Sequence, residues 1–132
     1  MAKFKASRRG NMTIELGGEE RLVRPSFSAM LEFEETSGYG AYEALRGLQG
    51  SKINSKMIVS AIWAGIRGAH PSKEDTCPSW REVGEMCFEK GMAACIGDAL
   101  KFLTLGLAGA TAAEEVINEQ GKPLSVSPKE ED

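Results

Sequence analysis

The chain has 132 residues, of which 42% are hydrophobic and 27% charged, as is usual for a globular protein with one core. Its net charge of −3 lacks the basic excess that nucleic-acid binding requires, so we predict no nucleic-acid partner. Its three cysteines form no CxxC pair, which indicates reduced thiols and a cytoplasmic protein.

Residues 1–11 are predicted to be a flexible basic arm. They carry Lys3, Lys5, Arg8 and Arg9 without a periodic pattern. They also lack the apolar core that a signal peptide needs. We therefore expect a solvated terminus and no secretion.

A β-hairpin is predicted over residues 12–24. The segment 12–16 alternates apolar and polar residues, which is the pattern of a strand with one buried face. Gly17 and Gly18 supply a turn, and residues 21–24 return as the second strand. A hairpin alone is marginally stable in water, so it must pack on the helices or join another sheet.

The register of this hairpin is less well determined by the sequence. Pairing Ile14 with Leu22 makes an apolar pair on one face of the hairpin. The same register places Glu15 opposite Arg21, which makes an ion pair on the other face. This pairing implies a three-residue loop that ends at Glu19, where a glycine would be usual. The turn chemistry and the cross-strand pairing thus differ by one residue.

Two helices are predicted over residues 26–36 and 41–49, joined by a tight glycine-containing connector. Ser26 provides the N-cap of the first helix, and Gly38 suits its left-handed end. The apolar residues at helical spacing are expected to face the core. These are Phe27, Met30 and Leu31 in the first helix and Tyr42, Ala44, Leu45 and Leu48 in the second.

Glu34 is predicted to lie on the same side as the apolar stripe of the first helix, whereas Glu32 and Glu35 point away. A carboxylate on a buried face needs a partner, and the candidates are Arg46 and the free amides that begin the next helix. No second acid, base or nucleophile is positioned by spacing. We therefore interpret Glu34 as a cap and not as a catalytic residue.

Residues 54–69 are predicted to form the central helix of the domain. Asn54 can cap its first turn with the side-chain oxygen. Apolar residues cover most of its circumference and leave only Lys56, Ser60 and Arg67 polar, as in a helix surrounded by others. It is too short for a membrane span, and we expect no membrane partner.

Trp63 flanks the polar strip of this helix instead of facing the middle of the apolar arc. An indole at the edge of a surface is a common anchor of protein interfaces. It is as often a rim residue that a hairpin or loop covers. Both interpretations stay open, and Trp63 is a candidate protein-binding residue.

A polar loop is predicted over residues 70–78, and its one histidine, His70, lacks the further ligands of a zinc site. Ser79 and Glu82 then form a capping box for another helix. The residues expected to face inward in this helix are Trp80, Val83, Cys87 and Phe88.

After a kink at Gly91, a last helix is predicted over residues 92–108. Its apolar face should be Met92, Cys95, Ile96, Ala99, Leu100, Leu103 and Leu107, opposite Asp98, Lys101 and Thr104. Leu105 lies toward the polar side and Phe102 near its border, so both are further candidate protein-binding residues.

These elements predict a mainly α protein with an N-terminal β-hairpin, that is, an α+β fold with about five helices around the central one. The domain should span residues 12–109, followed by a mostly disordered acidic tail over residues 110–132. The sequence has no phosphate-binding glycine loop, nucleophile elbow or HExxH motif. We therefore expect no catalytic residue, metal or cofactor, and interpret the chain as a protein-binding module and not an enzyme.

Several short motifs follow one another along residues 12–108. They are Leu16-Gly17-Gly18, Arg24-Pro25-Ser26-Phe27, Leu31-Glu32-Phe33-Glu34, Gly38-Tyr39-Gly40 and the helix Ile62-Trp63-Ala64-Gly65-Ile66-Arg67-Gly68-Ala69. In this order and spacing they resemble the gene transfer agent family of small phage-tail proteins.

The resemblance implies a tail assembly chaperone of a long-tailed phage or prophage. Such a protein acts in the host cytoplasm during virion morphogenesis, where it binds the tape measure protein and helps to recruit tail tube subunits. A homo-oligomer is also implied. A tape measure is a long helical chain whose apolar stripe a helical domain can shield.

Two other functions stay open. The family name is also attached to a structural tail tube role, but tube subunits resemble β-sandwiches, whereas this sequence predicts one hairpin and about five helices. The third possibility is a small cytoplasmic regulator unrelated to phage.

Overall fold

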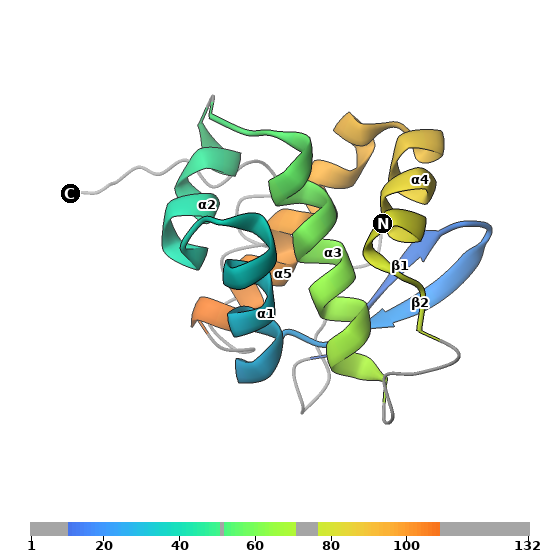
Figure 1. Cartoon of the computed structure of the whole chain (residues 1–132), viewed down its shortest axis with the longest axis horizontal. Helices are drawn as coiled ribbons and strands as arrows, with labels where there is room; N and C mark the ends of the chain where they lie inside the picture. Colours follow the sequence, from blue (N-terminus) through green and yellow to red (C-terminus); the bar gives the residue numbers. More distant parts are fainter. Residues whose placement is uncertain (1–10, 51, 71–76, 109–132) are drawn as a thin grey trace, which may run out of the picture.

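The computed structural model describes residues 11–50, 52–70 and 77–108 (Figure 1). Its elements are β1 (Met12–Leu16), β2 (Glu19–Val23), α1 (Phe27–Ser37), α2 (Ala41–Gln49), α3 (Ser55–Ala69), α4 (Trp80–Lys90), the 3-10 helix η1 (Met92–Cys95) and α5 (Ile96–Ala108). The predicted class, a mainly helical α+β fold with an N-terminal hairpin, is confirmed. Except for Asn11, the predicted arm and tail lie outside the described residues.

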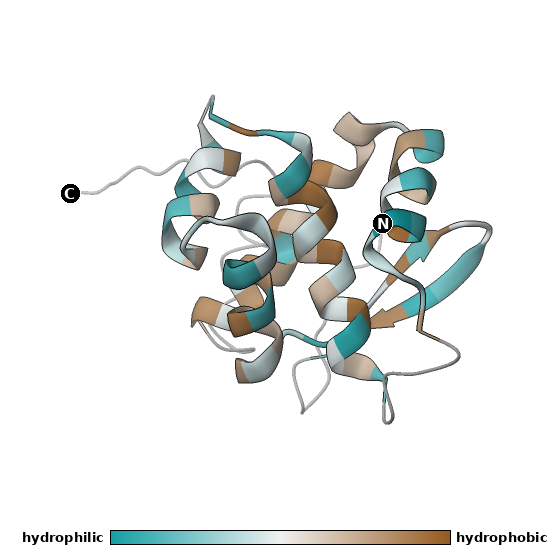
Figure 2. Ribbon diagram, in the orientation of Figure 1, coloured by the Kyte–Doolittle hydropathy of each residue, from teal (hydrophilic) through white to brown (hydrophobic). Residues whose placement is uncertain are grey.

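Helix α3 is the centre of the fold, as the sequence predicted. Figure 1 shows it flanked by α1 and α2 on one side and by α4 and the hairpin on the other, with α5 behind it. Figure 2 shows hydrophobic residues along both α3 and α5. The predicted N-cap is present, since the Asn54 Oδ1 accepts a hydrogen bond from the Met57 amide at 2.9 Å.

The hairpin register predicted from the Ile14–Leu22 pair is wrong. Ile14 lies opposite Arg21, and β2 begins at Glu19 because the loop contains only Gly17 and Gly18. Both glycines have positive φ angles, 66° and 79°, which the two-residue type I′ turn requires. The turn chemistry therefore decided the register over the cross-strand pairing.

This difference of one residue decides which side chains of β2 are buried. In the observed register Val23 lies opposite Met12, and both are buried, whereas Leu22 is 46% exposed. A shift of one residue exchanges the two faces of a strand. The hairpin thus packs on the helices with Met12, Ile14 and Leu16 inward.

The N-terminal caps of α1 and α4 are as predicted, but the inward faces of these helices and of α2 are only partly so. Met30, Ala44, Leu48, Val83 and Cys87 are buried as predicted. The Ser26 Oγ accepts from the Ala29 amide, and Ser79 and Glu82 form the capping box of α4. Four side chains predicted to face inward are exposed instead, which contradicts the prediction. They are Phe27 (78%), Leu31 (50%), Tyr42 (62%) and Phe88 (74%).

The physical reason is that each of these helices packs along a narrow arc. In α1 the buried residues are Ala29, Met30, Phe33 and Ser37, so the arc is turned away from Phe27 and Leu31. In α4 Val83 and Cys87 are fully buried, and Phe88 lies beyond their edge. An apolar residue at helical spacing can therefore fall outside the arc that a neighbouring helix covers.

The surface placement predicted for the last helix is also wrong. Phe102 is 0% exposed, Leu105 is 4% exposed, and Thr104 is buried as well. Helix α5 contacts α2 and α3, and the Phe102 ring lies 6.3 Å from that of Phe33. The chain bends by 112° at Gly91, which places α5 inside the bundle, where more than one of its sides is covered.

Close packing of α3 against its neighbours requires a glycine at residue 65. A methyl group there would lie 2.3 Å from a Val23 methyl and 2.9 Å from the Phe102 ring. We expect Gly65→Ala to lower the free energy of unfolding by about 1–2 kcal/mol, because overpacking outweighs the better helix propensity of alanine. Urea denaturation monitored by circular dichroism would measure this change.

The matched control is Gly97→Ala in α5, where a methyl group would meet no atom within 4 Å. This variant should be more stable than wild type by about 0.4–1 kcal/mol. Equal effects of the two substitutions would contradict the packing described for Gly65.

Candidate protein-binding surface

Trp63 lies at the edge of the buried arc of α3, as predicted, and is partly exposed. The Arg67 guanidinium lies 5.0 Å from the centre of its ring, a cation–π contact. Arg67 also donates to both carboxylate oxygens of Glu32 on α1, at 3.1 and 3.0 Å. This hydrogen bonding raises the pKa of Arg67. Glu32, predicted to point away from the core, thus ties α1 to α3.

A second indole covers the polar strip of α3 from the side of α4. Ser60 was predicted to be a polar surface residue, but it is 0% exposed. The Trp80 Nε1–H donates to the Ser60 Oγ at 3.1 Å, which satisfies the buried hydroxyl. Trp80 therefore contacts α3 about one helical turn before Trp63.

Helix α4 carries a shallow apolar groove beside this indole. Trp80, Gly84 and Phe88 recur every fourth residue on one side of the helix and, with Arg81, Glu85 and Met92, line a hollow of about 330 Å³. Gly84 has no side chain, and a methyl group there would lie 3.6 Å from a Val59 methyl of α3. We call this hollow the α4 groove.

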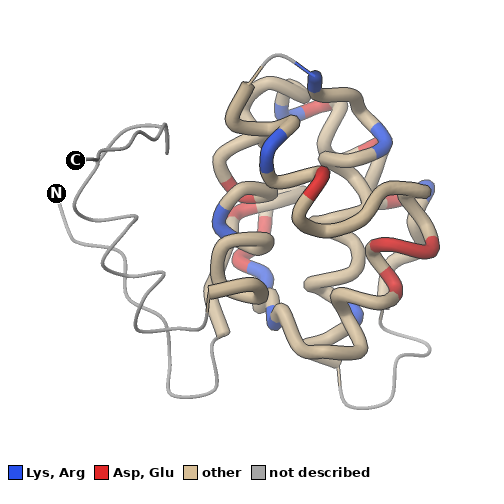
Figure 3. Tube along the Cα trace, turned by 90° about the vertical axis from the view of Figure 1, so that its left-hand side faces the viewer, with Lys and Arg blue, Asp and Glu red and all other residues tan. Residues whose placement is uncertain are grey.

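A second apolar surface lies on α1. Phe27 and Leu31 are one helical turn apart and both exposed, so their side chains are neighbours. We call these two residues the α1 patch. Figure 3 shows acidic and basic positions mixed over the side of the molecule that carries α1 and α2. Sequence periodicity grouped Phe27 with Leu31 and Trp80 with Phe88, but it placed both groups in the core.

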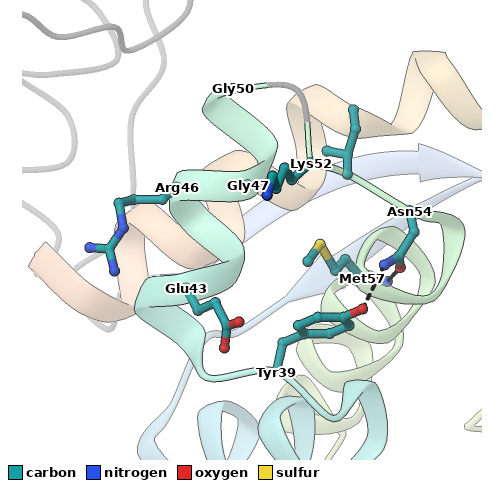
Figure 4. Close-up of a pocket in the computed structure, with 9 residues that line it drawn as sticks. Tyr39, Glu43, Arg46, Gly47, Gly50, Lys52, Asn54 and Met57 are labelled. Carbon is teal, nitrogen blue, oxygen red and sulfur yellow. Dashed lines mark hydrogen bonds between the residues drawn. The ribbon is translucent and has the colours of Figure 1, made fainter.

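Another hollow, of about 530 Å³, lies between α2 and the start of α3 (Figure 4). The Asn54 Nδ2 donates to the Tyr39 hydroxyl at 3.1 Å, while Glu43 accepts from the Gly40 amide. The polar groups of this hollow thus serve the ends of α2 and α3. Figure 4 shows the Arg46 side chain on the opposite side of α2 from Tyr39. Nothing in this arrangement pairs a nucleophile with a base.

The remaining titratable candidates are engaged in structural contacts. The Glu34 carboxylate accepts from the Ala41 amide at 2.9 Å, so its interpretation as a cap of the next helix is confirmed. Cys87 and Cys95 are both 0% exposed, and burial raises the pKa of Cys87 to about 12. Within the described ranges, no three His, Cys, Asp or Glu side chains gather in a way that could hold a metal ion.

In the described part of the chain, no single helix has the length and apolar composition to cross a membrane. Helix α4 and the segment Met92–Ala108 meet these two criteria only when they are counted together, and the chain bends by 112° between them. Comparison with known proteins gave no match to a family model, a curated protein or a solved structure. The functional assignment therefore depends on the described surface and the sequence motifs.

Thiol chemistry provides a test of this arrangement. Cys77 is partly exposed, whereas Cys87 stays buried and protonated even at a pH of about 9 because its pKa is about 12. We expect an aromatic disulfide reagent to modify one thiol quickly in the native protein. The other two should react only as fast as the fold opens.

The control for this titration is Cys77→Ser, which should remove the fast phase and leave the slow phases unchanged. Two or more fast thiols in the wild-type protein would show that the contact between α4 and η1 is looser than described.

Proposed function

We propose that this chain is a phage tail assembly chaperone, which binds the tape measure protein and helps to recruit tail tube subunits during virion morphogenesis. The observation that carries the proposal is the wide exposure of aromatic side chains on three helices. Phe27, Tyr42 and Phe88 are 78%, 62% and 74% exposed.

The arrangement of this apolar surface suits a helical partner. Isolated apolar residues on a protein surface are ordinary, but contiguous ones indicate binding sites. Here Phe27 adjoins Leu31 in the α1 patch, and Phe88 borders the α4 groove. A tape measure protein is a long helical chain that needs its apolar stripe shielded, and helical domains bind such stripes in grooves.

The sequence motifs from Leu16-Gly17-Gly18 to the helix that contains Trp63 support the same proposal through their resemblance to the gene transfer agent family. The protein would act in the host cytoplasm, without a cofactor, and could form a homo-oligomer. Trp63 stays a candidate binding residue because it is partly exposed beside Arg67. Phe102 and Leu105 are no longer candidates, since both are buried.

A structural component of the tail tube is the second candidate function. Tube subunits resemble β-sandwiches, which bury a core between two sheets. The described part of this chain has one two-stranded sheet and five α-helices. The tube role is therefore the alternative. The two roles differ in whether this chain is a component of the mature particle.

Co-expression with the tape measure gene of the same tail cluster tests the proposal. We expect an affinity tag on this chain to capture the tape measure protein, and the soluble fraction of the tape measure protein to rise. Absence of both effects would refute the chaperone function. A matched control is co-expression with a helical protein of similar length from outside the tail cluster, which should not be captured.

Purified particles distinguish the two functions. A chaperone should be absent from mature particles, or present far below the major tube subunit. Quantitative mass spectrometry that finds this chain in amounts comparable with the tube subunit would favour the structural role instead.

A further inference from the structure

We propose that residues 3–9 of this chain cover its own α1 patch, with Phe4 against Phe27 and Leu31 and with the neighbouring lysines beside the carboxylates at the end of α1. The inference concerns the chain without a partner and does not depend on the function proposed above. Three observations carry it: an open apolar pair on α1, two carboxylates next to that pair without a cation, and the place where β1 begins.

The α1 patch is an apolar surface that is open to a further contact. Phe27 is 78% exposed and Leu31 is 50% exposed, one helical turn apart. The patch borders the buried arc of α1, because Met30 is buried there and a methyl group added to Gly106 of α5 would meet its side chain. An apolar side chain laid across Phe27 and Leu31 would remove apolar area from water, which stabilises the contact.

The charges of α1 have one sign. The helix contains Glu32, Glu34 and Glu35 and neither Lys nor Arg. Glu32 is neutralised by its salt bridge to Arg67, at 3.0 Å. Within the described ranges, the other two glutamates form no salt bridge with a Lys or Arg side chain.

These two glutamates lie next to the patch. Glu34 and Glu35 follow Leu31 by three and four residues, so they are its neighbours on the helix surface, and both are exposed. Glu34 accepts a hydrogen bond from the Ala41 amide, but a neutral donor leaves the negative charge of the carboxylate in place. A segment that combines an apolar ring with cations therefore matches the patch and its border.

Residues 3–9, which lie outside the described ranges, have this composition. Their sequence is Lys-Phe-Lys-Ala-Ser-Arg-Arg, with four cations, one aromatic ring and no acidic residue. Phe4 stands between Lys3 and Lys5, so a ring placed on the patch would bring a cation to each side of it. Lysines near the C-terminal end of α1 would also interact favourably with the helix dipole.

The start of β1 places this segment close to α1. Met12 is paired with Val23, and three residues link Val23 to the first residue of α1 (Figure 1). The route from Met12 across the hairpin, along this link and up one turn of α1 to Leu31 is at most about 25 Å. Phe4 precedes Met12 by eight residues, which reach about 26 Å when extended. The segment is therefore long enough for Phe4 to contact the patch.

The covalent link between the two surfaces makes this contact favourable. One ring and a few exposed ion pairs would bind only weakly between separate molecules. A short tether raises the effective concentration to the order of millimolar, at which a weak contact can be populated. The surrounding charges are exposed, so the population of the contact should fall as salt is added.

Paramagnetic relaxation in the full chain tests the contact. A nitroxide would be attached to Ala6→Cys in the Cys77→Ser background, where the two remaining cysteines are buried. At low salt we expect the amide signals of Phe27, Leu31 and Glu35 to lose most of their intensity, and those around Phe88 on α4 to lose much less. High salt, with a Debye length of about 3 Å at 1 M, should restore part of the lost intensity.

Matched variants then identify the contacts. Phe4→Ser and Phe27→Ser should each reduce the broadening of the α1 signals by roughly twofold or more. Phe88→Ser, which removes a similarly exposed ring from α4, should leave it unchanged. Glu35→Lys should reduce both the broadening and its salt dependence, while Glu85→Lys on α4 should change neither. Circular dichroism would verify that each variant is folded.

Equal broadening of the α1 and α4 signals at low salt would overturn the inference. Broadening of the α1 signals that Phe4→Ser and Glu35→Lys both leave unchanged would also overturn it. A mixture of spin-labelled chain with isotope-labelled chain that carries no nitroxide separates the two copies. Broadening of the isotope-labelled chain in that mixture would show that the segment of a second copy occupies the patch, which contradicts an intramolecular contact.

The proposed function and this inference can fail separately. If the chain captures no tape measure protein but its α1 signals are broadened as expected, the chaperone function falls and the intramolecular contact stands. If the tape measure protein is captured and the α1 signals are not broadened selectively, the contact falls and the chaperone function stands.

Discussion

The fold depends on covering α3 on nearly every side. Apolar residues extend around most of this helix, and leaving them in water would cost more than a small domain can offset, since burial provides about 25 cal/mol per Å². The hairpin, α1, α4 and α5 all pack on it. Gly65 allows Val23 and the Phe102 ring to approach the helix backbone closely. Removing that space would disturb two covering elements at the same time.

Covering α3 also explains where apolar residues remain in solvent. Each surrounding helix contributes only the arc that faces α3 or α5, so apolar side chains beyond that arc stay exposed. Phe27 on α1 and Phe88 on α4 are such residues. The polar strip of α3 is used to fix these helices, through the Arg67–Glu32 pair on one side and the Ser60–Trp80 hydrogen bond on the other. A rigid core with exposed aromatic rings at its edges is suited to binding other helices.

Local chemistry was the most reliable guide from sequence to structure. The Asn54 cap, the Ser79–Glu82 box and the Glu34 contact to the next helix were all predicted from residue types at short separation, and all are present. The hairpin register failed because two local preferences disagreed. Adjacent glycines in a two-residue turn outweighed an apolar pair and an ion pair, which contribute only a few tenths to about 1 kcal/mol each.

The sequence by itself determined the helices, the hairpin, their order and the central place of α3, because periodicity and caps depend on neighbours within a few residues. Only the tertiary structure decided which arc of each helix is buried. Periodicity placed Phe88 inward and Phe102 near the surface, yet Phe102 packs beside Gly65 and Phe88 lies in solvent. The difference comes from the bend at Gly91, which inserts α5 into the bundle and leaves one side of α4 uncovered. The α4 groove depends on that placement, so no pattern within α4 could reveal it.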